Sequence, residues 1–239
     1  ISFGICFALA GSANMVSWLC MFFIKEPAKE PETEHPPILK YLRELPNVLR
    51  TNPNYSRYLT SQFLVIFGGM GLGFYVLFAK TRFAVDDGFV ANMTMAALVT
   101  QSGGIPLLGW LSDRKGHTWL GKLGAILGAL SAAVIIAAPE KNWMYAVFIL
   151  ANLSRECLAI SRKSITMEFC DPDRLPTYTA LSSALLAAPM LVAPVIGGWV
   201  IKMINYQSAF VASALFYVAG WLVLQRLVRD PRIDCGGTP

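Results

Sequence analysis

The chain has 239 residues and a formal net charge of +5; 55% of its residues are hydrophobic and only 15% are charged. A soluble globular domain carries roughly a quarter charged residues, so this composition predicts an integral membrane protein. The five cysteines and two histidines are scattered without the spacing of a metal site, and basic residues gathered in loops account for the positive charge. We therefore expect no metal, no cofactor and no nucleic-acid partner.

Seven apolar runs are each long enough to cross a bilayer as a helix, which takes about 20 residues. They cover residues 1–24, 59–79, 88–111, 118–138, 143–167, 177–201 and 206–226. Backbone in hydrocarbon must satisfy its own hydrogen bonds, so these runs predict helices rather than strands. The expected fold class is an all-α membrane protein with seven transmembrane helices.

Most of the 20 Lys and Arg residues lie in alternate connectors between these runs. By the positive-inside rule, residues 25–58, residues 112–118 and the C-terminal tail are expected in the cytoplasm. The connectors at 80–87 and 139–142 are expected to face outward.

The connector at 25–58 begins with KEPAKEPETEHPP, which predicts an extended, solvated linker. The following ILKYLRELPNVLR predicts an amphipathic helix on the membrane surface, with a plain solvated loop as the alternative. We expect four parts: residues 1–24, the cytoplasmic linker 25–58, a six-helix part 59–228 and a cytoplasmic tail 229–239.

Two glycine-containing stretches follow the linker. FGGMGLGFY, at residues 67–75, predicts a helix that bends or unwinds toward a cavity, or one that packs closely on a neighbour. GWLSDRKGHT, at residues 109–118, places Asp113 and Arg114 between Gly109 and Gly116. Glycine permits a tight turn, and Asp and Arg can lock helix ends electrostatically in one state. An ordinary basic loop is the alternative.

The second stretch resembles the signature loop of the major facilitator superfamily, Gly-x-x-x-Asp-Arg-x-Gly followed by two basic residues. Here His117 and Thr118 stand at the two following positions. Members of this family have twelve spans in two six-helix halves joined by a long cytoplasmic loop, and each half carries the motif after its second helix. The resemblance implies that the seven runs are helices six to twelve of the family. Residues 59–228 would form one half, built from two three-helix repeats.

The resemblance also implies that most of an N-terminal half is missing, which fits a chain that starts at Ile1 inside an apolar run. The segment MEFCDPDRLPTYTAL resembles a loop of poorly characterised bacterial members. We therefore expect a multi-pass protein of a prokaryotic inner membrane.

Two spans carry further similarities to family motifs. APVIGG, with Pro194, Gly197 and Gly198, resembles a Gly-Pro-x-x-Gly-Gly helix-packing motif in which Ala193 replaces the first glycine. In the run at 143–167, Arg155 stands where a family motif places an arginine, although the Gln and Gly that normally follow are absent.

Ionisable side chains deep in a span are costly, so Arg155 and the adjacent Glu156 are the main candidates for contact with a solute or a coupling proton. Interhelical hydrogen bonds that hold both residues in place are the alternative. The resemblance implies that the first, second, fourth and fifth helices of the half line the pathway. Other polar residues in these helices are candidates for the same pathway or for helix packing: Asn152, Tyr75, Asn92, Gln101 and Tyr178.

The sequence thus predicts a secondary active transporter that moves a small solute across the bilayer by alternating access, with a coupling proton or ion as a candidate partner. The alternative is a non-transporting membrane receptor or assembly protein on a transporter fold. An enzyme is not expected, because no His, Cys or carboxylate residues cluster at one membrane depth. A primary, ATP-driven pump is not expected within this chain either, because the sequence lacks a phosphate-binding Gly-Lys-Ser/Thr loop.

Overall fold

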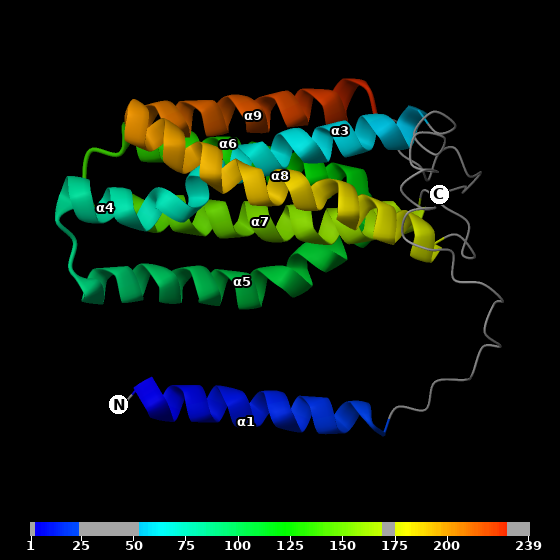
Figure 1. Cartoon of the computed structure of the whole chain (residues 1–239), viewed down its shortest axis with the longest axis horizontal. Coiled ribbons are helices and arrows are strands. Elements are labelled where there is room, and N and C mark those ends of the chain that lie inside the picture. Colours follow the sequence, from blue (N-terminus) through cyan, green and yellow to red (C-terminus); the bar gives the residue numbers. More distant parts are fainter. Residues whose placement is uncertain (1–2, 24–52, 169–174, 229–239) are drawn as a thin grey trace. The chain divides into compact units, whose positions relative to one another are not determined.

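The computed structural model of the chain describes residues 3–23, 53–168 and 175–228, and of residues 3, 6 and 175–178 it describes the backbone alone. The chain divides into two units, residues 1–37 and 38–239, which are considered separately. In the described ranges every regular element is a helix (Figure 1). The all-α prediction is confirmed, whereas the amphipathic helix expected at 38–50 and the tail at 229–239 lie outside the described residues.

The first unit contributes α1 (Phe3–Met21), a helix of 19 residues. Two of its polar side chains bond to its own backbone: Ser12 Oγ donates to the carbonyl of Leu9 at 2.9 Å, and Asn14 Nδ2 to that of Ala10 at 3.1 Å. Such local bonds satisfy polar groups inside an apolar helix. The composition of α1 therefore suits a lipid environment.

The second unit holds the remaining helices. They are α3 (Pro53–Gly68), the 3-10 helix η1 (Gly69–Phe74), α4 (Tyr75–Phe83), α5 (Asp87–Lys115), α6 (His117–Ala137), α7 (Trp143–Glu168), α8 (Leu175–Met203) and α9 (Tyr206–Arg226). The elements α3, η1 and α4 follow one another without a break and span Pro53–Phe83. Each of the six apolar runs expected after the linker therefore corresponds to one helical rod.

Five helices among the described residues are long and apolar enough to cross a membrane. They are Pro53–Phe83, His117–Ala137, Trp143–Glu168, Thr179–Met203 and Tyr206–Arg226, and α1 contains a shorter apolar stretch, Phe7–Met21. The helix α5, at 29 residues, is long enough to cross as well. Polar residues such as Asn92 and Gln101, together with four glycines, lower its mean hydropathy. The chain is an all-α membrane protein.

The centre of the six-helix unit is built on close packing of α6 against α7 and α9, and α3 also packs closely against α9. Small residues permit this approach, because a Cβ at Gly124 would lie 2.8 Å from Leu158 Cγ. Hydroxyl groups of α7 also bond to α6: Ser154 Oγ donates to the carbonyl of Gly124 at 2.7 Å, and Ser161 Oγ to that of His117 at 2.8 Å. By contrast, α5 and α8 pack less extensively and leave large apolar side chains exposed.

The glycine run at 67–75 contains the 3-10 helix η1, which interrupts the α-helix but is wound more tightly than an α-helix rather than unwound. The alternative prediction, close packing on a neighbour, describes the run better. A Cβ at Gly68 would lie 2.6 Å from Tyr217 Cγ, and the backbone N–H of Gly71 donates to Ser213 Oγ of α9 at 3.2 Å. The glycines therefore let α9 approach the backbone of η1 and bind one of its N–H groups.

Candidate functional site

A cluster of polar side chains joins α5 to α7 inside the apolar unit. Gln101 Nε2 donates a hydrogen bond to Glu156 Oε1 at 2.7 Å, and Arg155 Nη2 lies 3.4 Å from the same oxygen. The side chain of Glu156 is only 14% exposed, whereas that of Arg155 is 57% exposed. A carboxylate in this position is stabilised by the amide donor and by the guanidinium charge.

Beside this cluster lies a cavity of about 320 Å³ between α3, η1, α7 and α8. Its charged lining residues are Arg155 and Arg162, both from α7. Most of the other lining is apolar and includes Val65, Leu72 and Met190. Arg162 Nε donates a hydrogen bond to Gln62 Oε1 of α3 at 3.3 Å. The cavity thus combines an apolar surface with two cationic side chains.

The signature stretch occupies the end of α5 rather than a loop. Asp113 and Arg114 lie in the last turn of α5, which ends at Lys115, and α6 begins at His117. The sequence analysis placed Asp113 and Arg114 between two spans, because the predicted apolar run ends at residue 111, just before these charges. Gly116 alone connects the helices, with φ at 94°. A residue with a Cβ rarely adopts this backbone conformation, so glycine is required here.

The turn at Gly116 is joined to α7 through His117, together with Ser112 and Glu168, which the sequence did not single out. The buried hydroxyl of Ser112 shares a hydrogen bond with His117 Nδ1, and His117 Nε2 lies 3.5 Å from Glu168 Oε1 at the end of α7. Two cations stack on tryptophans nearby: Arg114 lies 4.2 Å from the ring centroid of Trp110, and Lys115 Nζ lies 4.7 Å from that of Trp119. These contacts join three helices at one end of the unit.

The expected packing motif lies in α8 against η1. A Cβ at Gly197 would lie 2.6 Å from the carbonyl oxygen of Met70, and a Cβ at Gly198 would lie 3.2 Å from Phe74 Cζ. Pro194 lines the cavity. Glycine at 197 therefore permits backbone contact between α8 and η1.

The remaining pathway candidates have separate surroundings. Asn152 Nδ2 donates to the carbonyl of Phe148 at 2.9 Å within α7, and Asn92 is exposed on α5. Tyr75 is buried, with its hydroxyl 3.3 Å from Ser131 Oγ and its ring packed edge-on against a phenylalanine of α9. The side chain of Tyr178 lies outside the described residues. The structure brings Gln101, Arg155 and Glu156 together and leaves Tyr75 in the apolar core.

Arg162 is a charged cavity residue that the sequence analysis did not single out, although it lies in the run at 143–167. Its spacing of seven residues from Arg155 was a usable signal, since seven residues make close to two helical turns and place both side chains on one face. The contacts of Gln62 and Glu168 join distant parts of the chain, and no local pattern indicates them.

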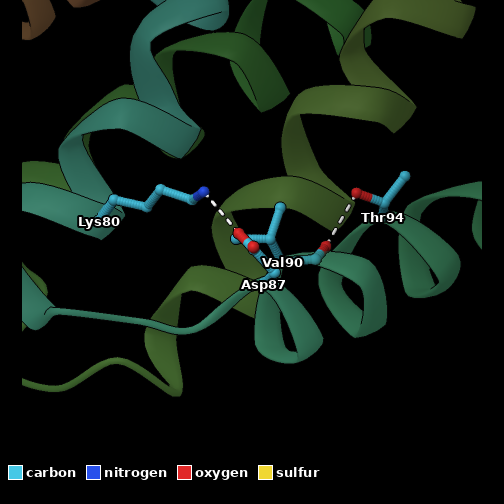
Figure 2. A network of polar contacts seen from close by, with 4 residues as sticks. All are labelled: Lys80, Asp87, Val90 and Thr94. Carbon is cyan, nitrogen blue, oxygen red and sulfur yellow. Dashed lines mark hydrogen bonds and ion pairs between the residues drawn. The ribbon is translucent and has the colours of Figure 1, made fainter.

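At the opposite end of α5, an ion pair closes the turn from α4. Lys80 Nζ lies 2.7 Å from Asp87 Oδ1, and Thr94 Oγ1 donates to the carbonyl of Val90 at 2.9 Å (Figure 2). The hydrogen bond and the positive charge of Lys80 lower the pKa of Asp87 below its ordinary value of 3.8. Asp87 also stands in the first turn of α5, where a negative charge is favourable.

Residues 58–234 match the family model described as Major Facilitator Superfamily. The chain belongs to the major facilitator superfamily of membrane transporters. A stretch of 134 residues is 25% identical to the chloramphenicol resistance protein CraA of Acinetobacter baumannii, and it covers 56% of this chain and 32% of that protein. The chain thus spans about a third of the length of this relative. The resemblance drawn from the signature stretch is confirmed.

Proposed function

We propose that the chain forms the C-terminal part of a secondary active transporter that moves a small solute by alternating access. The observation that carries this proposal is the contact between Gln101 and the pair Arg155–Glu156, beside a cavity in a membrane-embedded unit. Ionisable groups inside a membrane unit are costly and commonly mark solute or proton pathways. Membership of a transporter family supports the same function.

In this proposal α3 with η1, α5, α7 and α8 line the pathway, and α6 and α9 lie behind them. Gln101, Arg155 and Glu156 would contact the solute or a coupling proton, and Asn92 would line the pathway on α5. The burial of Tyr75 and the local bond of Asn152 favour packing roles for these two residues.

The end of α5 would act as the conformational switch. Asp113, Arg114 and the Gly116 turn lie where three helices are joined through Ser112, His117 and Glu168. Interfaces with two discrete arrangements amplify small shifts, so such a junction suits a change between inward-open and outward-open states. Gly109 and the α8 glycines would permit the accompanying movement of helices.

The partners follow from the same proposal. The transporter would lie in a bacterial inner membrane and would work with an N-terminal half of the same chain, which would cover the exposed sides of α5 and α8. The linker 25–58 would join the two halves in the cytoplasm. A proton held by Glu156 is the first coupling ion to test, because its carboxylate is mostly buried and lies next to Arg155.

Counterflow in proteoliposomes tests the proposal. Vesicles containing the full-length transporter are preloaded with an unlabelled solute, and the entry of the labelled solute is followed. A carrier exchanges labelled for unlabelled solute even when no net concentration gradient of the solute drives its entry, whereas a receptor or assembly protein does not. The name of the relative makes chloramphenicol one solute to include, together with a panel of organic acids.

Arg155→Ala and Arg226→Ala form a matched pair for this assay, because Arg226 is an exposed residue at the end of α9. Loss of counterflow in the first variant alone, with folded yield unchanged, supports a pathway role for Arg155. Normal counterflow by Arg155→Ala would exclude that role. A full-length protein that exchanges no solute of the panel would favour the receptor alternative.

A further inference from the structure

The two arginines of the cavity differ in how their charges are balanced. Arg155 lies 3.4 Å from a carboxylate oxygen of Glu156. Arg162, which is half-buried, has no carboxylate within ion-pair distance in the described part of the chain, and its side chain bonds only to the neutral Gln62 there. A partly buried cation without a counter-charge is costly, so Arg162 is the better placed of the two arginines to bind an anion in the cavity.

Gln62 lies beside Arg162, but it does not itself line the cavity. Its side chain is fully buried, and its oxygen accepts the bond from Arg162. Its Nε2 has no hydrogen-bond partner among the described residues. Gln62 therefore positions the guanidinium of Arg162, and the donors available to a ligand in the cavity are the remaining N–H groups of Arg162.

The rest of the cavity is suited to an apolar group. Val65, Ile66, Leu72, Leu158 and Met190 contribute aliphatic or thioether surface. The volume of about 320 Å³ is at the lower end of the usual range for small-molecule sites. An ion without an apolar body would leave most of this surface without contacts.

We infer that the cavity binds an organic anion with a short apolar body, and that Arg162, supported by Gln62, recognises its carboxylate or comparable oxyanion. A guanidinium matches the planar geometry of a carboxylate through two parallel hydrogen bonds. This inference rests on the proposed transport function and names its solute class. In this inference Arg162, rather than Arg155, recognises the negative charge of the solute, because Glu156 already neutralises Arg155.

Thermal unfolding of the protein in phosphatidylcholine nanodiscs provides the test, because a ligand that binds the folded state raises the unfolding midpoint Tm even when binding is weak. Hexanoate and hexanamide are the probes, since they share a chain and differ in head-group charge. The same shift in Tm is expected at a hexanoate concentration about tenfold lower than that of hexanamide. If hexanoate and hexanamide give the same shift in Tm at equal concentrations, the inference is overturned. This comparison needs no variant and no transport activity.

Substitutions show which arginine causes the preference for hexanoate over hexanamide. Arg162→Gln should abolish the advantage of hexanoate, and Arg162→Lys should retain part of it, because lysine keeps the charge but loses the planar fork of donors. Arg226→Gln, which changes an exposed arginine of α9, should retain the whole advantage. An advantage that survives in Arg162→Gln and disappears in Arg155→Gln would overturn the assignment to Arg162.

An anionic lipid head group offers the same chemistry, so the test is repeated with phosphatidylglycerol in the nanodiscs. If the site binds a soluble solute, the preference for hexanoate should persist in these nanodiscs. If phosphatidylglycerol removes it in the wild type, the site holds a lipid and the solute assignment is wrong. A protein that prefers hexanoate but shows no counterflow refutes the transport proposal while the anion site stands. Counterflow without a hexanoate preference refutes the anion site while the transport proposal stands.

Discussion

The ring of Tyr217 occupies the space that a side chain at Gly128 would need. A Cβ at Gly128 would lie 2.6 Å from Cε1 and Cζ of that ring, and one at Gly68 would lie 2.6 Å from Cγ. Tyr217 is itself buried. One aromatic side chain of α9 therefore sets how closely α3 and α6 approach it, and it does so through glycines on both helices.

Gly128→Ala should destabilise the six-helix unit, because the buried ring of Tyr217 cannot move without disturbing the packing on α3. The expected cost is about 1–3 kcal/mol, as for overpacking in other protein cores. Thermal unfolding in nanodiscs measures it. Gly103→Ala is the matched control, since a Cβ there meets nothing within 4 Å. Equal Tm values for the two variants would show that the ring yields freely.

The two glycines of the signature stretch should respond differently to alanine. Gly116→Ala forces a side chain into a backbone with φ at 94°, which costs roughly 1–3 kcal/mol. Gly109 is helical, and a Cβ there meets nothing within 4 Å. Gly109→Ala should therefore leave stability unchanged or raise it by up to about 1 kcal/mol. Unfolding midpoints of both variants decide this, and a larger loss at Gly109 would contradict it.

The pair Lys80–Asp87 should give pH-dependent stability at its end of the unit. Because Lys80 lowers the pKa of Asp87 in the folded protein, the contribution is complete above the ordinary value of 3.8 and is lost as the pH falls through the folded pKa. A carboxyl-carbon NMR titration should find the midpoint of Asp87 below 3.8. Lys80→Met should move it back toward that value. An unchanged midpoint in Lys80→Met would mean that the ion pair is not maintained in solution.

The topology predicted from the charges can be tested at exposed positions near the two ends of α5. In a cysteine-free background, Asp86→Cys should react with an impermeant maleimide added outside intact cells, and Lys115→Cys should react only after permeabilisation. Both native residues are exposed, whereas Ser112 in the same turn is buried and would be a poor reporter. Labelling of Lys115→Cys from outside would reverse the assignment.

Asp113→Asn should slow the exchange of conformations and leave solute affinity within a few-fold of the wild type. It removes a charge where three helices meet, and the expected change in the balance of states is about 1–3 kcal/mol. Counterflow rate and ligand-dependent Tm separate the two effects. Glu140→Gln, an exposed carboxylate in the α6–α7 connector, serves as control. An unaltered rate in Asp113→Asn would leave this residue only a solubilising role.

The sequence predicted helix positions well where the apolar length alone determines them. The runs 118–138 and 206–226 match α6 (His117–Ala137) and α9 (Tyr206–Arg226) to within a residue. The charged start of the second run was misjudged, because Arg57 was assigned to the connector 25–58 but lies within α3. Long cationic side chains can reach out from the end of a helix, so a charge does not by itself end a span.

The candidate site could be predicted only in part. Arg155 and Glu156 stand out because charges in an apolar run are costly. Their contact with Gln101 depends on the pairing of α5 with α7, and the junction of His117 with Glu168 joins residues that are 51 positions apart in the sequence. Tyr75 resembles a pathway residue in the sequence, yet a bond to Ser131 satisfies its hydroxyl inside the core.

The 3-10 helix η1 also rotates α4 relative to α3 about the axis of the continuous span Pro53–Phe83. A 3-10 helix turns by about 120° per residue and an α-helix by about 100°, so the six residues of η1 add about 120° of rotation. Counted as uninterrupted α-helix, Tyr58 and Tyr75 would point in nearly perpendicular directions, about 100° apart. With the added rotation they fall within about 20° of one another. Both are buried, so a rod that continued as α-helix through the glycines would turn one of its buried faces out of the core.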